Sequence, residues 1–358
     1  MSEVSRAAPA PKKCANLCLS LVCTDSIAAV LAKTKPMFST LLSLPALPFF
    51  LLQSNTSIST SINLLFFQLT WSTLVLSHSP LIVELVGSLL IRLIFSALPS
   101  LLFLFLDTCL PAITERWKSK TTLRAQKRGG KKLWSVIAVA LGNIALATGV
   151  QGVIEGGLVY GLGWKSALRI AKTLPSPTGV VWDIFCAEVG REILTYGIHR
   201  YLLHNKSANS PRGLVKAHRN WAHAEYGVAG GLNAQYDHPV AYLLRAFLPM
   251  YLPAALVLRM HVLTWFIWLV VVSLLEVVGY SGYIDAPTGW VPFGFGLEWL
   301  VGTVDGHFGS RGRKGFGIWG VVDWAGGTKV VRGREWIGDM MGEGNVIPSG
   351  PRRKSRND

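Results

Sequence analysis

Charge is scarce in this sequence, and negative charge is scarcer still. Only 15% of the 358 residues are charged, and 20 acidic residues stand against 35 lysines and arginines. Half of the residues are apolar, and the mean hydropathy is +0.38. A chain of this length is long enough for two soluble domains, but this composition and its long apolar runs argue against them. We therefore expect an integral membrane protein, in which each span needs about 20 apolar residues.

Cysteine is also scarce. The five cysteines form no CxxC pair, and an odd number does not indicate a disulfide framework. The net charge of +15 invites a nucleic-acid partner, but the basic residues gather in the loop 114–132 and after the last apolar run. Such clusters at the ends of spans mark the cytoplasmic side of a membrane. We expect no nucleic-acid binding, and contact with anionic lipid headgroups is a secondary interpretation.

Five apolar runs are candidates for transmembrane helices. They cover residues 62–76, 81–113, 133–153, 240–258 and 262–278. Residues 179–204 have helical periodicity but carry charges that would be costly against lipid, so these side chains should point inward. They are Asp183, Glu188, Arg191 and Glu192. Counting this helix as a return crossing gives six crossings and both termini in the cytoplasm. The predicted fold class is all-α, a membrane multi-helix bundle with a cytoplasmic histidine-rich cap.

Composition divides the chain into four regions. They are an N-terminal, partly interfacial segment (1–57), an N-terminal transmembrane region (58–178) with the basic cytoplasmic loop 114–132, a histidine-rich domain (179–330), and a disordered basic tail (331–358).

Histidine is concentrated in the third region. Six of the eight histidines lie there within reach of the predicted cytoplasmic side: His199, His204, His218, His223, His238 and His307. Imidazole is the commonest side-chain ligand of iron, zinc and copper, so this density, with few cysteines, predicts a metal site. Any one of them alone is more often an ordinary surface or core residue. The ordered series is what supports ligation.

The pairs His199/His204 and His218/His223 share a spacing of five residues. Five residues advance an α-helix by about 140°, so the members of a pair share a face only if the helix ends or bulges between them. His78 and His261 fall in turns that the predicted topology places about 30 Å away across the membrane. We exclude those two from the site.

A glycine-rich segment follows residue 278. It contains GFGIWG (315–320), a formal match to the dinucleotide-binding pattern GxGxxG. No βαβ unit surrounds this match, so a dinucleotide-binding interpretation carries little weight. We interpret the segment as turns that cover the cytoplasmic face of the helical bundle.

Several motifs carry a resemblance to a known family. They are HRYLLH (199–204), AHRNWAH (217–223), YDHP (236–239), GYSGY (279–283), DGHF (305–308) and FGIWGVVDWAGGT (316–328). In this order they resemble the fatty acid hydroxylase superfamily, which includes sterol desaturases, and most closely a fungal branch with divergent histidine clusters. The resemblance implies two irons, held by cytoplasmic histidine clusters, that activate O2 to attack an unactivated C–H bond of a lipid. It also implies a cytochrome b5-type electron donor and residence in the endoplasmic reticulum.

The histidine clusters depart from the pattern of that family. Trp221 and Ala222 stand where ligands are usual, Tyr280 replaces a frequent histidine, and Phe308 stands in an incomplete third cluster. Two irons are expected from the family, while one or none is possible for this chain. The candidate metal ligands are His199, His204, His218, His223, His238 and His307. The candidate carboxylate ligands, or supports of the ligating histidines, are Glu192, Asp237 and Asp305.

Three functions compete on the sequence. The first is an iron-dependent hydroxylase or desaturase of a fatty acyl, sphingolipid or sterol substrate. The second is a catalytically decayed oxygenase fold that binds lipid or serves as a membrane scaffold, which the substitutions Ala222, Tyr280 and Phe308 favour. The third is a transporter that uses Glu84 and Arg92 within one span. These two residues lie about 80° apart around a helix, so a structural ion pair explains them equally well.

Overall fold

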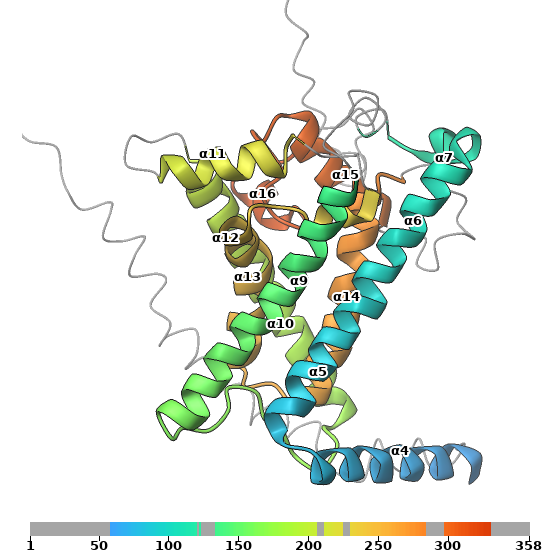
Figure 1. Ribbon diagram of the computed structural model, residues 1–358, viewed down its shortest axis with the longest axis vertical. Coiled ribbons are helices and arrows are strands. Elements are labelled where there is room, and N and C mark those ends of the chain that lie inside the picture. The colour runs from blue at the N-terminus through green and yellow to red at the C-terminus, as the bar shows by residue number, and fades with distance from the viewer. Residues whose placement is uncertain are drawn as a thin grey trace, which may run out of the picture. The chain divides into compact units, whose positions relative to one another are not determined.

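The protein is helical throughout the part that the structure describes. The computed structural model describes residues 58–119, 122, 133–205, 211–224, 230–283 and 297–330 (Figure 1). No strand occurs in these ranges, and the two bridges found there are isolated pairs. This confirms the predicted all-α class. The segment 1–57, the tail 331–358 and most of the basic loop lie outside the described residues.

In chain order, the described helices are α4 (Ile58–Ser77), α5 (Pro80–Arg92), η1 (Leu93–Ala97), α6 (Leu98–Cys109), α7 (Pro111–Trp117), α9 (Leu133–Gly156), η2 (Gly157–Gly161), α10 (Pro177–Ile198), η3 (His199–Leu203), α11 (Arg212–Trp221), η4 (Gly230–Ala234), α12 (Pro239–Tyr242), η5 (Leu243–Phe247), α13 (Leu248–Leu252), η6 (Pro253–Val257), α14 (Val262–Ser281), α15 (Leu297–Gly309) and α16 (Val321–Ala325). The η elements are single π turns, except for η4, which is a 3₁₀ helix.

Four helices of the described chain are long and apolar enough to cross a membrane. They are Pro80–Cys109, Leu133–Gly161, Pro239–Val257 and Val262–Ser281. Two of them begin with proline, which suits the first turn of a helix because the N–H that it lacks has no partner there. The first span runs past Pro99, and a π turn immediately before that proline absorbs the missing hydrogen bond.

Two predicted crossings differ from the structure. The apolar part of α4, Leu65–Ser77, is too short to count as a span, and α4 lies across the direction of α5 (Figure 1). Helix α10, which the sequence predicts to be a return crossing, is also not among the four candidate membrane spans. Its four charged side chains explain this, since an apolar window of span length tolerates few of them.

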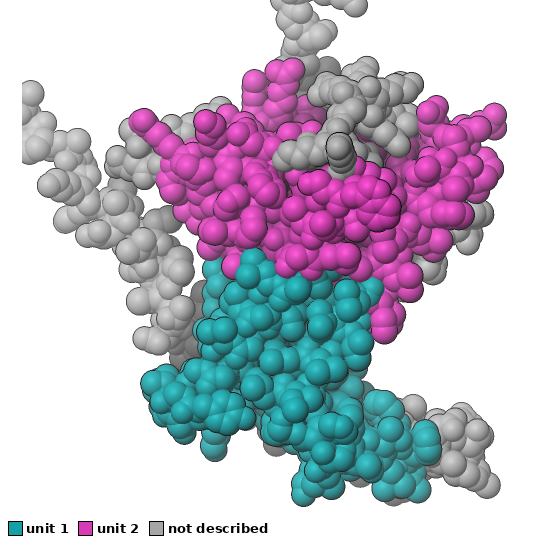
Figure 2. Space-filling view, in the orientation of Figure 1, with its two compact units in different colours: residues 1–93, 144–191, 246–272 teal, residues 94–143, 192–245, 273–358 magenta. Residues whose placement is uncertain are grey.

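Contacts divide the chain into two compact units (Figure 2). Unit 1 comprises residues 1–93, 144–191 and 246–272, and unit 2 comprises residues 94–143, 192–245 and 273–358. Because the units interleave along the chain, they do not test the division into four regions. That division stays a prediction.

Unit 1 buries several charged side chains of its apolar helices. Asp183 and Arg191 are buried, and Glu188 accepts hydrogen bonds from Arg191 (2.6 Å) and Trp268 (2.9 Å). The inward orientation predicted for these α10 residues is therefore confirmed. His78 forms a hydrogen bond with Ser77, and the ring of His261 packs against Trp71.

The predicted pair of Glu84 and Arg92 has other partners in unit 1. Glu84 accepts a hydrogen bond from Gln151 over 2.7 Å, whereas Arg92 contacts the sulfur of Met250 at 3.8 Å. Both side chains are buried. The contacts shown for each residue are thus separate, which removes the observation that favoured a transporter.

Unit 2 is organised around a small apolar core and a few buried polar contacts. The core cluster consists of Leu104, Val136, Ala140, Leu232 and Tyr236. The amide of Asn143 on α9 donates to the main-chain carbonyls of Gln235 and Asp237, both at 2.9 Å. These bonds fix the segment that follows η4. All six candidate histidine ligands belong to this unit.

Candidate metal centre

The π turn η3 begins at His199 and is followed directly by His204. The N–H of His204 donates to the carbonyl of His199 over 3.0 Å, which spans one residue more than an α-helical bond. Because the π turn contains this extra residue, the side chain of His204 lies on the same side of the helix as that of His199. The two ring centroids lie 4.9 Å apart. The bulge that the spacing requires is therefore present.

His218 and His223 satisfy the same spacing by the other route, a helix end. His218 lies in the last turn of α11, and His223 lies in the turn after the helix has ended at Trp221. The Nε2 atom of His223 is 3.1 Å from Nε2 of His204 and 3.3 Å from Nε2 of His307. The ring of His223 therefore lies next to the ring of His204, so the two histidine pairs form one cluster.

His307 comes from α15, and the chain turns back sharply beyond it. The N–H of Gly312 donates to the carbonyl of His307 over 2.9 Å, and Gly312 has φ +70°. A Cβ atom on Gly312 would lie 2.3 Å from Cε1 of His204 and 3.1 Å from Cε1 of His223. Only glycine fits here, because it tolerates the left-handed backbone and leaves room for both rings.

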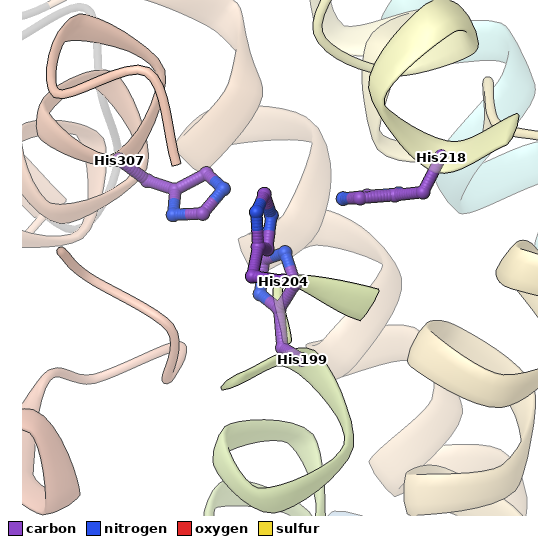
Figure 3. Close-up of side chains that lie close together, drawn as sticks. All are labelled: His199, His204, His218 and His307. Carbon is purple, nitrogen blue, oxygen red and sulfur yellow. The ribbon is translucent and has the colours of Figure 1, made fainter. Parts of the chain in front are cut away.

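The ring nitrogens converge on one small space. One nitrogen from each of His199, His204, His218 and His307 lies within 4.8 Å of the other three. In Figure 3, His307 and His218 point toward His204 from opposite sides, and His199 lies beside it. Nitrogens that share an ion through bonds of about 2.1 Å are about 3.0–3.4 Å apart when adjacent and about 4.2 Å apart when opposite. The observed spacing needs only a small contraction to match.

The outer nitrogens of three imidazoles are held by hydrogen bonds. Nδ1 of His199 lies 3.0 Å from the carbonyl oxygen of Phe316, and Nδ1 of His307 lies 2.9 Å from that of Lys314. A carbonyl oxygen only accepts, so each Nδ1 carries the proton and each Nε2 presents a lone pair. Nδ1 of His218 is 2.7 Å from a carboxylate oxygen of Asp237. This arrangement orients imidazoles for metal binding.

The inner nitrogens are suited to a metal ion. Nε2 of His199 and Nε2 of His218 are buried and find no hydrogen-bond partner among the residues that the structure describes. Burial, together with the neighbouring His218, lowers the pKa of His307 to about 3. Burial, reinforced by His307, also lowers the pKa of His223 well below its ordinary value. The rings of His307 and His223 are therefore neutral at pH 7, which is the form that binds iron, zinc or copper.

His238 and Asp237 have different surroundings although they are adjacent. Asp237 is fully buried and serves His218 as described above. The ring of His238 packs edge-on against Trp221 at 5.5 Å, and its main-chain N–H donates to Asp237. The structure therefore brings five of the six candidate histidines together and leaves His238 outside that group. Ligation by any of them stays a prediction.

The other two candidate carboxylates hold main-chain or hydroxyl groups. Glu192 accepts from the N–H groups of Ile318 (2.7 Å) and Trp319 (3.0 Å). One oxygen of Asp305 accepts from the hydroxyls of Ser119 (2.5 Å) and Thr122 (3.0 Å). These contacts fit a supporting role better than ligation.

One supporting residue escaped the sequence analysis. Asp323 on α16 is fully buried and accepts from the N–H groups of Phe316 (2.8 Å) and Gly317 (2.6 Å) and from the hydroxyl of Thr328 (2.7 Å). It therefore positions the carbonyl that orients His199. The available signal was an acidic residue between apolar neighbours in VVDWA, within a motif noted only for its resemblance.

The fold and the site together define a class. In the ranges that the structure describes, the protein is all-helical, with four candidate membrane spans and a buried polyhistidine cluster of the kind that holds a metal ion. Residues 184–328 match the family model described as fatty acid hydroxylase, so this part of the chain is similar to that family. The match includes all six candidate histidines and confirms the recognition made from the motifs. No solved structure matches the chain.

Proposed function

We propose that this protein is an iron-dependent membrane oxidoreductase that hydroxylates or desaturates a lipid. The observation that carries the proposal is the convergence of ring nitrogens from His199, His204, His218 and His307 within 4.8 Å. Lipid hydroxylation is what similarity to the fatty acid hydroxylase family suggests. The four candidate spans suit a substrate that is itself dissolved in a membrane.

In this proposal the imidazoles bind the metal ion, and hydrogen bonds to neighbouring carboxylate and carbonyl oxygens fix the orientation of the imidazoles. His199, His204, His218, His223 and His307 supply the nitrogens. Iron bound there supplies the activation of O2 needed to remove hydrogen from an unactivated C–H bond. Among the supports, Asp237 makes the imidazole of His218 a stronger electron-pair donor to the metal by accepting a hydrogen bond from its Nδ1–H. Its burial prevents water from competing for that hydrogen bond.

The remaining features belong to the proposal by family analogy. Electrons would arrive from a cytochrome b5-type carrier, and the chain would reside in the endoplasmic reticulum with its histidines facing the cytoplasm. The substrate would be a fatty acyl chain, a sphingolipid or a sterol whose reacting carbon reaches the histidines. Glu192 and Asp305 would support the cluster rather than bind iron, and His238 would take no part in holding it.

The test compares the full chain with two single variants in cells that lack it. We expect wild type to bind iron and to produce a lipid that has gained one oxygen atom or lost two hydrogen atoms. His199→Ala should lose both properties. His78→Ala is the matched control, because His78 is exposed and lies in the other unit. A folded wild-type chain that binds no iron would refute the proposal and favour a lipid-binding or scaffold protein.

A further inference from the structure

We infer that the centre binds a single metal ion, and that Arg245, Tyr280 and Phe308 close the space beside it to a second one. The inference rests on the proposed function and deepens it. It begins from the number and spacing of the donors. Five imidazole nitrogens lie close together, and a transition metal takes four to six ligands. One ion therefore uses all of them and leaves at most one position for O2 or water.

The ring of Phe308 lies against the cluster, and the ring of Tyr280 lies behind that of Phe308. The ring of Phe308 is 4.9 Å from that of His223 and 5.3 Å from that of His307. Tyr280 follows, with its ring 6.0 Å from Phe308. Phenylalanine has no donor atom for a metal. The phenol of Tyr280 accepts a hydrogen bond from Nη1 of Arg245 over 2.8 Å, so that oxygen is engaged.

Arg245 adds a permanent positive charge at this place. Its side chain is buried, Nη2 donates to the carbonyl of Ala234 over 2.8 Å, and Nε lies 3.6 Å from Asp237. A guanidinium has no lone pair to offer and does not lose its proton in proteins. Asp237 is the same carboxylate that holds His218. Its negative charge is thus already balanced by Arg245, and a second dication nearby would be repelled.

The other carboxylates do not assemble a second set of ligands. Glu192 stands seven residues before His199, about 10 Å along the helix, and it binds the main chain at residues 318 and 319. Asp305 stands two residues before His307, about 200° around α15, and it faces hydroxyl groups. Only one group of at least three potential ligands occurs in the described ranges, and it is the histidine cluster.

Cobalt titration of the purified, metal-free full chain in detergent tests this inference. Co²⁺ held by imidazoles absorbs visible light, so absorbance rises until the sites are full. We expect a break at one equivalent per chain, and elemental analysis after gel filtration should find the same ratio. His218→Ala should weaken binding at least 100-fold. His238→Ala is the matched control and should keep the break and the spectrum of the wild type.

The outcomes separate the inference from the function on which it rests. A break at two equivalents, or the loss of half of the bound cobalt in His238→Ala, would overturn the single-ion inference and leave the oxygenase proposal standing. A folded chain that binds no cobalt and no iron would overturn both.

Discussion

Replacing Gly312 by alanine should displace a metal ligand without unfolding the protein. The new Cβ atom would lie 2.3 Å from Cε1 and 2.7 Å from Nδ1 of His204, where ordinary contacts begin at 3.4 Å. The ring of His204 must therefore retreat by about 1 Å. A metal–nitrogen bond of about 2.1 Å tolerates errors of only a few tenths of an ångström.

The size of the effect follows from these distances. Losing a group that merely supports a ligand costs about 10–100-fold in metal affinity, so removing His204 from bonding distance should cost about 100-fold or more. The backbone strain is smaller. Alanine at φ +70° costs about 1 kcal/mol, a modest part of the stability of a folded domain.

Gly327→Ala is the matched control. Gly327 also has a left-handed backbone, with φ +67°, but a Cβ atom there would meet nothing within 4 Å. Both variants should therefore lose similar stability in thermal unfolding without metal. In a cobalt titration only Gly312→Ala should bind weakly. Equal affinity in the two variants would refute the position that we assign to His204.

Three further predictions concern proton uptake, a buried carboxylate and the π turn. Burial lowers the pKa of His307 to about 3 from its ordinary 6.5, so its contribution to stability is complete above pH 6.5 and declines as the pH falls toward 3. From this group alone the metal-free protein should lose about 2 kcal/mol between pH 7 and pH 5, and equal unfolding free energies at both would contradict it. Asp323→Asn should cost about 3 kcal/mol, because an amide oxygen cannot replace both oxygens that accept main-chain N–H groups; an unchanged melting temperature would show that these bonds matter little. Deleting the exposed Tyr201 from η3 should preserve cobalt binding, since His199 and His204 would then stand four apart on one face of an ordinary helix. Inserting an alanine after Tyr201 should abolish it, and the reverse result would show that the π turn does not set the ring positions.

The sequence predicted the all-α class and the local backbone geometry that brings the paired histidines to one side of a helix. Spacing alone showed that His199 and His204 need a bulge or a helix end between them, because helical geometry leaves no other solution. The burial of charge on α10 followed from the cost of exposing it to lipid. The sequence did not predict that α4 lies across α5 and is not among the candidate membrane spans. Composition does not report the orientation of a helix, because a helix that lies across its neighbour can have the same apolar residues as one that runs alongside it.

The supports of the cluster were harder to predict, because most of them are main-chain atoms. Every residue has a main-chain carbonyl, so the identity of a residue does not reveal that its carbonyl binds a histidine. The carbonyl of Lys314 binds His307, and the carbonyl of Phe316 binds His199. Asp237 was predictable as a candidate support because its carboxylate is apparent in the sequence, but its pairing with His218 required the structure. Asp323 is also apparent in the sequence as an acidic residue among apolar ones, but its role depends on the position of the segment 316–317, which the sequence does not give.

The segment from Gly312 to Trp319 connects these observations. It leaves room for the ring of His204, orients Nδ1 of His307 through Lys314, and orients Nδ1 of His199 through Phe316. Its own conformation depends on two buried carboxylates, Glu192 and Asp323, which accept four of its main-chain N–H groups. Since a main-chain shift moves several imidazoles together, a change in either carboxylate should act on the cluster as a whole. The glycine pattern of this segment therefore serves to bring the backbone close to the histidines, the same physical requirement that glycine meets where a backbone approaches a nucleotide phosphate.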